Sequence, residues 1–244
     1  FGLSDAKYAE MLDTVGTIIH NALRVDFNIT VDSYEDVHIQ SVRHFIDFSL
    51  HSTHHAHFHF VSSVATIGAW KPTHGPAVPS ESIEDIEVVL PQGYGESKHI
   101  GERICLTASR HSGVPTTIHR VGQVAGPTME KGLWNRQEWV PAIVATSKSL
   151  GLVSETLGST SVDWIPVDLL ASIISDLIST RRETGPDTRC AVFNLVNPSV
   201  TSWRALLPDI QARYPVQPVP FTEWITALED IENPRLKRSR RSLR

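Results

Sequence analysis

Short apolar runs alternate with amphipathic segments along most of this chain, a pattern typical of strands alternating with helices. The apolar runs predict strands at residues 15–22, 58–63, 115–121 and 191–196. Helices are predicted at residues 36–50, 94–112, 137–150, 168–180, 202–213 and 221–231. This alternation favours the α/β class, with a parallel sheet and helices on both of its faces.

The pattern changes after Gly126-Pro127, so we divide the chain there into residues 1–126 and residues 127–232. Segments 162–180 and 191–196 of the second part are expected to return to the main sheet. Residues 71–93 contain four prolines and form a long irregular connection. Connections of this length are usually functional or disordered, and we expect this one to run over a substrate cleft.

Composition indicates an ordinary folded protein, with 41% hydrophobic and 20% charged residues. No apolar run approaches the roughly 20 residues of a membrane span, and Asp5 and Glu10 interrupt any signal peptide. With only Cys105 and Cys190, a disulfide framework is excluded and a cytoplasmic location is expected. Cys105 is expected to be a buried packing residue.

Charge is distributed unevenly. Residues 233–244 hold six basic residues and no acid, which leaves 16 basic against 27 acidic residues elsewhere, a net charge of −11. A nucleic-acid partner is therefore not expected. The basic tail is compatible with a nuclear signal or an anion-binding patch, but a frayed or frameshifted end is the preferred interpretation.

The strongest chemical signal is the sequence Tyr94-Gly95-Glu96-Ser97-Lys98. On a helix, Tyr94 and Lys98 are four residues apart and project from one face. An ammonium group beside a phenol favours the phenolate, so Lys98 is expected to lower the pKa of Tyr94 from about 10 and make it a usable acid. Because Tyr and Lys often meet at this spacing by chance, the motif gains weight from the apolar strand before it, which ends in Ser62-Ser63.

Together these features resemble the extended short-chain dehydrogenase/reductase superfamily, and within it the thioester reductase domains of fungal synthetase-like enzymes and carboxylic acid reductases. The matching blocks are residues 1–4 (FGLS), 18–22 (IIHNA), 93–98 (GYGESK), 120–123 (RVGQ), 134–140 (WNRQEWV) and 162–168 (VDWIPVD). The resemblance implies a Rossmann-like sheet followed by a smaller substrate lobe in residues 127–232.

Members of that family begin with a strand, a glycine-rich turn and a helix that receives the cofactor pyrophosphate. No GxGxxG or GxxGxxG occurs among the residues of this chain. This favours a truncated sheet that has lost one or two βα units, with weak or no NADPH binding as the consequence. A natural short protein that binds its cofactor differently is the alternative.

The resemblance implies roles for particular residues. Ser63, Tyr94 and Lys98 would be catalytic; Ser63 is preferred to Ser62 by alignment with the family pattern, and strand alternation lets only one of them face the cleft. Both serines could instead cap the strand end. NADPH would be bound by His20, Asn21, Ala22, Tyr94, Lys98, Val121 and Gly122.

Other residue clusters have competing interpretations. Trp134, Asn135 and Trp139 are expected to bind substrate, because amphipathic rings suit a phosphopantetheine arm or an aromatic acyl group. For Trp164, core packing is at least as good an interpretation, and Asp168 is expected to cap a helix. Five histidines at positions 51, 54, 55, 57 and 59 suggest a metal, but no acid or cysteine lies among them. We expect them at a surface junction and predict no metal site.

The predicted function is NADPH-dependent reduction of an acyl thioester, held on a phosphopantetheinylated carrier protein, to an aldehyde. Tyr94 and Ser63 would stabilise the oxyanion. Two alternatives remain: a short-chain reductase or epimerase acting on a free small molecule, and a catalytically inactive fragment. The 134–140 block argues against the first, and the missing glycine turn favours the second.

Overall fold

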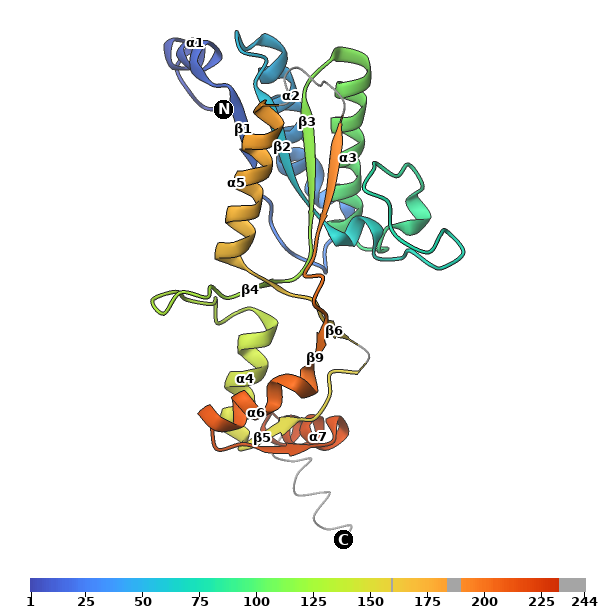
Figure 1. The fold of residues 1–244 in the computed structure, drawn as a ribbon, viewed down its shortest axis with the longest axis vertical. Coiled ribbons are helices and arrows are strands. Elements are labelled where there is room, and N and C mark those ends of the chain that lie inside the picture. Colours follow the sequence, from blue (N-terminus) through green and yellow to red (C-terminus); the bar gives the residue numbers. More distant parts are fainter. Residues whose placement is uncertain (159, 184–189, 233–244) are drawn as a thin grey trace. The chain divides into compact units, whose positions relative to one another are not determined.

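The computed structural model describes residues 1–158, 160–183 and 190–232 (Figure 1). The chain divides into two compact units. Unit 1 comprises Phe1–Gln123 and Leu169–Val196, and unit 2 comprises Val124–Asp168 and the described residues from Asn197 onward. The assignment of a substrate lobe to residues 127–232 stays a prediction.

Unit 1 is built on a parallel sheet. Its described strands are ordered β1 (Thr17–His20), β2 (His57–Ser63), β3 (Thr116–Val121) and β8 (Ala191–Leu195). In the register Ser63 lies beside Val121, and Val121 lies beside Leu195, so these three residues mark the carboxyl edge of the sheet. The predicted α/β class with a parallel, Rossmann-like sheet is confirmed.

Helices lie on both faces of this sheet (Figure 1). On one face, α2 (Gln40–His51) and α3 (Gly93–Ser112) bury a core that includes Phe58, Phe60 and Ile118. Most of α5 (Val167–Glu183) belongs to the other face, where the Arg181 guanidinium donates to the Thr117 hydroxyl at 3.3 Å. Successive strand residues point to opposite faces, which is why Thr117 and Ile118 meet different helices.

Helix α3 carries the Tyr94 motif, and glycines define both of its ends. At Gly93 a Cβ would collide with the backbone of residues 29–31, so only glycine lets this loop approach the helix start. At Gly113 the backbone is left-handed, with φ of 66°, which ends the helix as glycine commonly does.

Two elements at the N-terminal side differ from the prediction. Helix α1 (Asp5–Thr14) was not expected; its Ser4 cap accepts from the Lys7 amide at 3.4 Å. The helix predicted from residue 36 begins instead as a 3-10 turn at Val31–Tyr34 and a π turn at Glu35–Ile39, and becomes α-helical only at Gln40. Further 3-10 turns lie at Val64–Ile67 and Ile86–Val88.

Unit 2 packs helices around short strand pairs. Its helices are α4 (Trp139–Leu150), α6 (Trp203–Arg213) and α7 (Phe221–Glu232). The strands pair as β4 (Val124–Ala125) with β7 (Ile165–Pro166), β5 (Leu152–Ser154) with β10 (Gln217–Val219), and β6 (Ser161–Val162) with β9 (Thr201–Ser202). Buried tryptophans join these elements: Trp203 donates to the Ser154 carbonyl oxygen at 2.8 Å, and Trp224 donates to the Ser147 hydroxyl at 3.2 Å.

Candidate active site at the carboxyl edge of the sheet

Tyr94 and Lys98 lie one helical turn apart on α3, as their spacing predicts. Tyr94 is half-buried and Lys98 is 4% exposed. The Lys98 ammonium lies 5.0 Å from the centre of the Phe60 ring and 6.0 Å from the centre of the Tyr94 ring. The Phe27 ring, from the loop after β1, packs edge-on against the Tyr94 ring, with the two ring centres 5.2 Å apart. The phenol and the ammonium therefore share one partly enclosed site.

Lys98 is anchored to the strand below it. Its Nζ donates to the Val61 carbonyl oxygen at 2.5 Å. Burial lowers the pKa of Lys98 from 10.5 to about 8, while the Glu102 carboxylate acts in the opposite direction. Desolvation disfavours the charged form of a buried lysine, and here it exceeds the attraction of the nearby carboxylate.

The pKa of Tyr94 differs from the prediction. Burial raises the pKa of Tyr94 above its usual value of 10, a side-chain hydrogen bond with Ser63 opposes this, and Tyr34 adds to it. The expectation that Lys98 lowers the pKa of Tyr94 is therefore wrong for this structure. The reason is that the ammonium points to the Val61 carbonyl oxygen and burial of the phenol dominates.

The two serines at the end of β2 have different partners. The Ser63 hydroxyl is hydrogen-bonded with Tyr94 and accepts from the Ala65 amide at 3.1 Å, which caps the 3-10 turn Val64–Ile67. The Ser62 hydroxyl points to the opposite side and donates to Glu102 at 2.6 Å. Of the two, Ser63 is the one that the structure brings to Tyr94.

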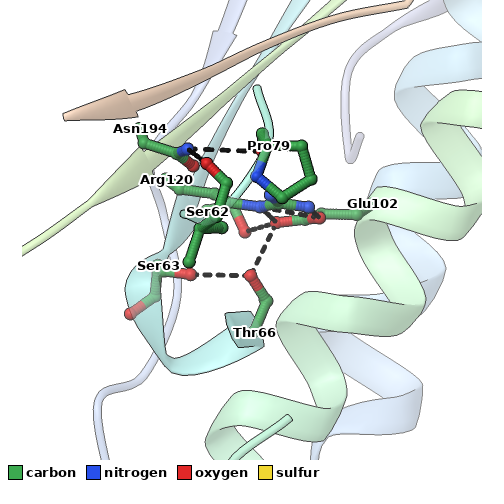
Figure 2. A network of polar contacts seen from close by, with 8 residues as sticks. Ser62, Ser63, Thr66, Pro79, Glu102, Arg120 and Asn194 are labelled. Atoms are coloured by element: carbon green, nitrogen blue, oxygen red, sulfur yellow. Dashed lines mark hydrogen bonds and ion pairs between the residues drawn. The ribbon is translucent and has the colours of Figure 1, made fainter. Parts of the chain in front are cut away.

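Sequence reasoning missed a buried polar network beneath this site (Figure 2). Glu102 is fully buried on α3 and pairs with Arg120 of β3, which is 1% exposed, with Oε2 and Nη2 at 2.7 Å. The same carboxylate accepts from Ser62 and lies 3.0 Å from the Thr66 hydroxyl. Spacing alone places Glu102 on the helix face of Tyr94 and Lys98, but it gives no signal for its partner Arg120.

The residues predicted to bind cofactor occupy different surroundings. His20 is buried among aromatic rings, its Nε2 lies 3.1 Å from the Ser41 hydroxyl, and burial lowers its pKa to about 4. Asn21 and Ala22 follow the end of β1 and are exposed. Across the sheet, Val121 lies beside Ser63, and the Gly122 amide donates to the Leu195 carbonyl oxygen at 3.0 Å. Their cofactor roles stay predictions.

The donor set fits the nicotinamide end of a dinucleotide. The hydroxyls of Ser63 and Tyr94 and the ammonium of Lys98 gather where parallel strands end, which is where open α/β sheets bind ligands. The sequence contains no glycine-rich GxGxxG turn. We therefore assign no residue of this chain to the pyrophosphate end.

The predicted substrate residues belong to unit 2. There Trp134 and Trp139 each meet Trp164 edge-on, with ring centres 6.1 Å and 5.6 Å apart. The Asn135 side chain accepts from the Gln137 amide at 3.0 Å, in the turn before α4. Trp164 is 9% exposed and is a core residue of this unit. Asp168 binds the Thr128 amide and hydroxyl, at 3.1 Å and 2.5 Å.

The connection at residues 71–93 is fastened to unit 1. The Asn194 amide nitrogen lies 3.4 Å from the carbonyl oxygens of Val78 and Pro79 (Figure 2). Glu84 forms ion pairs with Arg103 at 2.9 Å and with Arg110 at 3.2 Å, both on α3. A position over a substrate cleft stays a prediction.

The histidines at positions 57 and 59 are not at the surface, contrary to the prediction. His57 is 8% exposed and His59 is fully buried on β2, where its Nδ1 lies 3.1 Å from Nε2 of His119. Burial lowers the pKa of His59 to about 3 and that of His119 to about 4. They are neutral packing residues of the sheet, and no group of three metal-ligating side chains is found in the described part of the chain.

None of the helices in the described ranges is long and apolar enough to cross a membrane. Cys105 is free and fully buried, and its pKa is raised by burial, in agreement with the packing role expected from the sequence.

Comparison with known proteins gives consistent results. The model of an NAD-binding family described as male sterility protein matches residues 1–174. A carboxylic acid reductase of Neurospora crassa is 40% identical over 232 residues, which are 93% of this chain and 22% of that protein. An adenylate-forming reductase of Serpula lacrymans is 31% identical over 239 residues, 93% of this chain and 20% of that protein.

Among solved structures, the terminal R domain from the myxalamid PKS-NRPS biosynthetic pathway has a TM-score of 0.75 and 26% identity. The match covers 94% of this chain and 56% of that one. The chain thus spans about a fifth of the length of the curated relatives named above.

Proposed function

This chain belongs to the NAD-binding family described as male sterility protein, as a thioester reductase domain related to carboxylic acid reductases, and from that premise we propose that it reduces a carrier-bound acyl thioester to an aldehyde. The observation that carries the proposal is the grouping of Ser63, Tyr94 and Lys98 at the carboxyl edge of the sheet. The proposed hydride donor is NADPH, and the partner is a phosphopantetheinylated carrier protein.

Ser63 and Tyr94 act on the carbonyl oxygen of the thioester. NADPH, when bound, supplies the hydride that forms the new C–H bond at the carbonyl carbon. Negative charge then develops on the oxygen, and the two hydroxyls stabilise it by hydrogen bonds that strengthen in the transition state. Breaking of the C–S bond releases the aldehyde as the carbonyl re-forms; the electron pair of that bond stays on the sulfur, which takes a proton from the solvent and leaves as the thiol of the carrier arm.

The raised pKa of Tyr94 keeps the phenol protonated throughout the neutral range, so its role in this proposal is to donate a hydrogen bond to the developing oxyanion rather than to give up its proton. The hydroxyl of Ser63 interacts with the phenol and lowers its pKa, which places both groups where they can act on one carbonyl oxygen. Lys98 contributes positive charge near the developing oxyanion. One of its three N–H donors binds the Val61 carbonyl oxygen, so two remain for a ligand.

Substrate recognition is proposed for unit 2. Trp134, Asn135 and Trp139 precede or begin α4, and Trp139 is 37% exposed, so its ring is available to an acyl group or a pantetheine arm. Relatives named carboxylic acid reductase and terminal R domain support an acyl substrate.

The test is Tyr94→Phe in the complete gene product that carries this chain. Purified enzyme is mixed with an acyl thioester on its carrier protein and NADPH, and aldehyde formation is followed. We expect turnover to fall by about 10²-fold or more, with NADPH affinity little changed, because one hydroxyl is removed and the ring is kept. Ser63→Ala should lower turnover alone, whereas Lys98→Ala should weaken both turnover and cofactor binding.

Tyr8→Phe is the matched control, since it removes a phenolic hydroxyl from α1, where the Tyr8 ring packs on Phe48. If Tyr94→Phe retained most of the thioester-reducing activity, the assignment of this site would be overturned.

A further inference from the structure

Glu102 and Arg120 form several hydrogen bonds to each other in addition to their ion pair. Arg120 approaches the carboxylate with two nitrogens: Nε lies 3.0 Å and 3.2 Å from the two oxygens, and Nη2 lies 2.7 Å from Oε2. Both side chains are essentially inaccessible to solvent. A buried pair of this kind stabilises little when compared with apolar residues of similar size, so its presence calls for a role in specifying geometry.

The pair joins the segments that carry the site. Glu102 extends from α3, two turns after Tyr94, and Arg120 extends from β3. Ser62 ties the end of β2 to the same carboxylate at 2.6 Å, and Thr66 ties the 3-10 turn to it at 3.0 Å. Four segments therefore converge on one buried carboxylate, as Figure 2 shows.

Thr66 connects this network to Ser63. Its hydroxyl lies 3.0 Å from Glu102 Oε1 and 2.9 Å from the Ser63 carbonyl oxygen, and its one proton is shared between these acceptors. The turn that contains Thr66 also supplies the Ala65 amide, which donates to the Ser63 hydroxyl at 3.1 Å. Moving Thr66 thus changes both the backbone and the hydroxyl of Ser63.

The turn is pressed against the start of α3. A Cβ at Gly95 would lie 3.2 Å from the Ala65 carbonyl oxygen, so the residue beside Tyr94 touches the turn. The Leu90 amide donates to the same carbonyl oxygen at 2.9 Å. The network, the turn and the helix start are therefore in direct contact.

We propose that Glu102, held by Arg120, is a positioning residue that acts through Thr66 to hold the Ser63 hydroxyl against the Tyr94 hydroxyl. It touches neither substrate nor cofactor; it fixes the distance between two donors that must reach one carbonyl oxygen. The inference rests on the proposed function for its catalytic meaning, but the geometry it describes can be tested without turnover.

Thr66→Val is the informative variant, because Glu102→Gln leaves a buried guanidinium uncompensated and risks failure to fold. Valine keeps the shape and removes the hydroxyl, whereas Thr66→Ser restores the hydroxyl. Thr116→Val is the matched control: Thr116 is a fully buried threonine of β3 that lies beside Phe58, roughly 16 Å along the strand from Val121 at about 3.3 Å per residue.

The first measurement uses the 244-residue chain labelled with 3-fluorotyrosine. The ¹⁹F resonance of residue 94 is the one absent from Tyr94→Phe, and its pH titration reports the ionisation of that phenol. Lys98, Tyr34 and Ser63 are the polar or titratable groups facing it, and all three are unchanged in the Thr66 variants.

Since the hydrogen bond with Ser63 lowers the pKa of Tyr94, Thr66→Val should raise that pKa, and Thr66→Ser and Thr116→Val should not. In a Ser63→Ala background Thr66→Val should add no further rise, because its effect passes through Ser63. An unchanged titration in Thr66→Val, or an equal rise with and without Ser63, would overturn the inference.

The second measurement is turnover in the complete gene product. Thr66→Val should lower kcat about 10-fold with KM unchanged, the size expected for one positioning hydrogen bond, and Thr66→Ser should restore it. If the wild-type enzyme reduces no thioester while the ¹⁹F results hold, the proposed function fails and the positioning role stands. If turnover is normal but Thr66→Val matches the wild type in both assays, the positioning role fails alone.

Discussion

Lys98 should reduce the stability of the fold that contains it. Its ammonium is 4% exposed, and burial lowers its pKa from 10.5 to about 8. At roughly 1.4 kcal/mol per pH unit, that difference corresponds to about 3 kcal/mol of disfavour for the charged form in the folded state. Lys98→Met, which keeps an unbranched side chain of similar length, should remove this penalty.

The direction in which stability changes with pH follows from the difference in proton binding between the folded and unfolded states. At pH 7 both folded and unfolded states hold the Lys98 proton, so the wild type bears the full penalty. Between about pH 8 and 10.5 the unfolded state binds the proton and the folded state does not, so wild-type stability rises with pH relative to Lys98→Met. Above pH 10.5 the difference due to charge is gone.

The gain at pH 7 will be smaller than the full penalty. The ammonium lies 5.0 Å from the centre of the Phe60 ring, a cation–π contact worth about 1–2 kcal/mol when desolvated, and this contact is lost in Lys98→Met. We therefore expect Lys98→Met to be more stable than the wild type by about 1–2 kcal/mol at pH 7, with activity lost.

Urea unfolding followed by circular dichroism at pH 7, 8, 9 and 10 measures the difference between the two proteins. Lys7→Met is the control, because the side chain of Lys7 on α1 is 54% exposed and bears no comparable burial penalty. A wild type that is the more stable protein at pH 7, with a difference that does not change with pH, would refute the reasoning.

Three further predictions follow from the same structure. Glu102→Gln should lower the free energy of unfolding in urea by about 3–5 kcal/mol, because Arg120 stays buried and charged. The double variant Glu102→Leu with Arg120→Met should recover most of that loss, and equal stability of Glu102→Gln and wild type would contradict this. The chain should self-associate through β1, an edge among the described strands, where Ile19 is 55% exposed; Ile19→Lys should weaken the association in sedimentation measurements, and a concentration-independent wild-type monomer would count against it. In the active enzyme, kcat should fall as pH rises through about 8, where Lys98 loses its charge, and a flat profile to pH 9.5 would argue against a role for that charge.

Much of unit 1 could be predicted because its strands are buried on both faces. Phe58 and Phe60 face the helices on one side of the sheet, and His59 faces the other side. Because both sides are buried, the strand appears in the sequence as a continuous run without exposed polar positions. Helix α3 was predictable from the four-residue spacing of Tyr94 and Lys98 near its start and from Gly113 at its end. Helix α1 was missed because it has no buried residue, although Ser4 provides a capping signal.

The placement of Tyr94 and Lys98 on one helix face was also predictable, since helical spacing is a local property, and the family resemblance supplied the strand-end serine. The Glu102–Arg120 pair was not, because its partners are 18 residues apart and meet only when β3 lies beside β2 under α3. Which side chains are buried beneath a helix depends on the tertiary order of the strands, and periodicity does not supply that order.

The same limit explains the error in the pKa of Tyr94. Spacing places an ammonium near the phenol, but spacing gives no measure of how deeply the phenol is buried. The folded chain adds the Phe27 ring edge-on to Tyr94, and burial is the largest influence on the pKa of the phenol. Burial moves the two groups in opposite directions, raising the pKa of Tyr94 and lowering that of Lys98 to about 8. Below pH 8 the site therefore holds a protonated phenol beside a charged ammonium, the pair of states that a reduction requires, because the oxygen of the reacting carbonyl gains charge and must be met by donors.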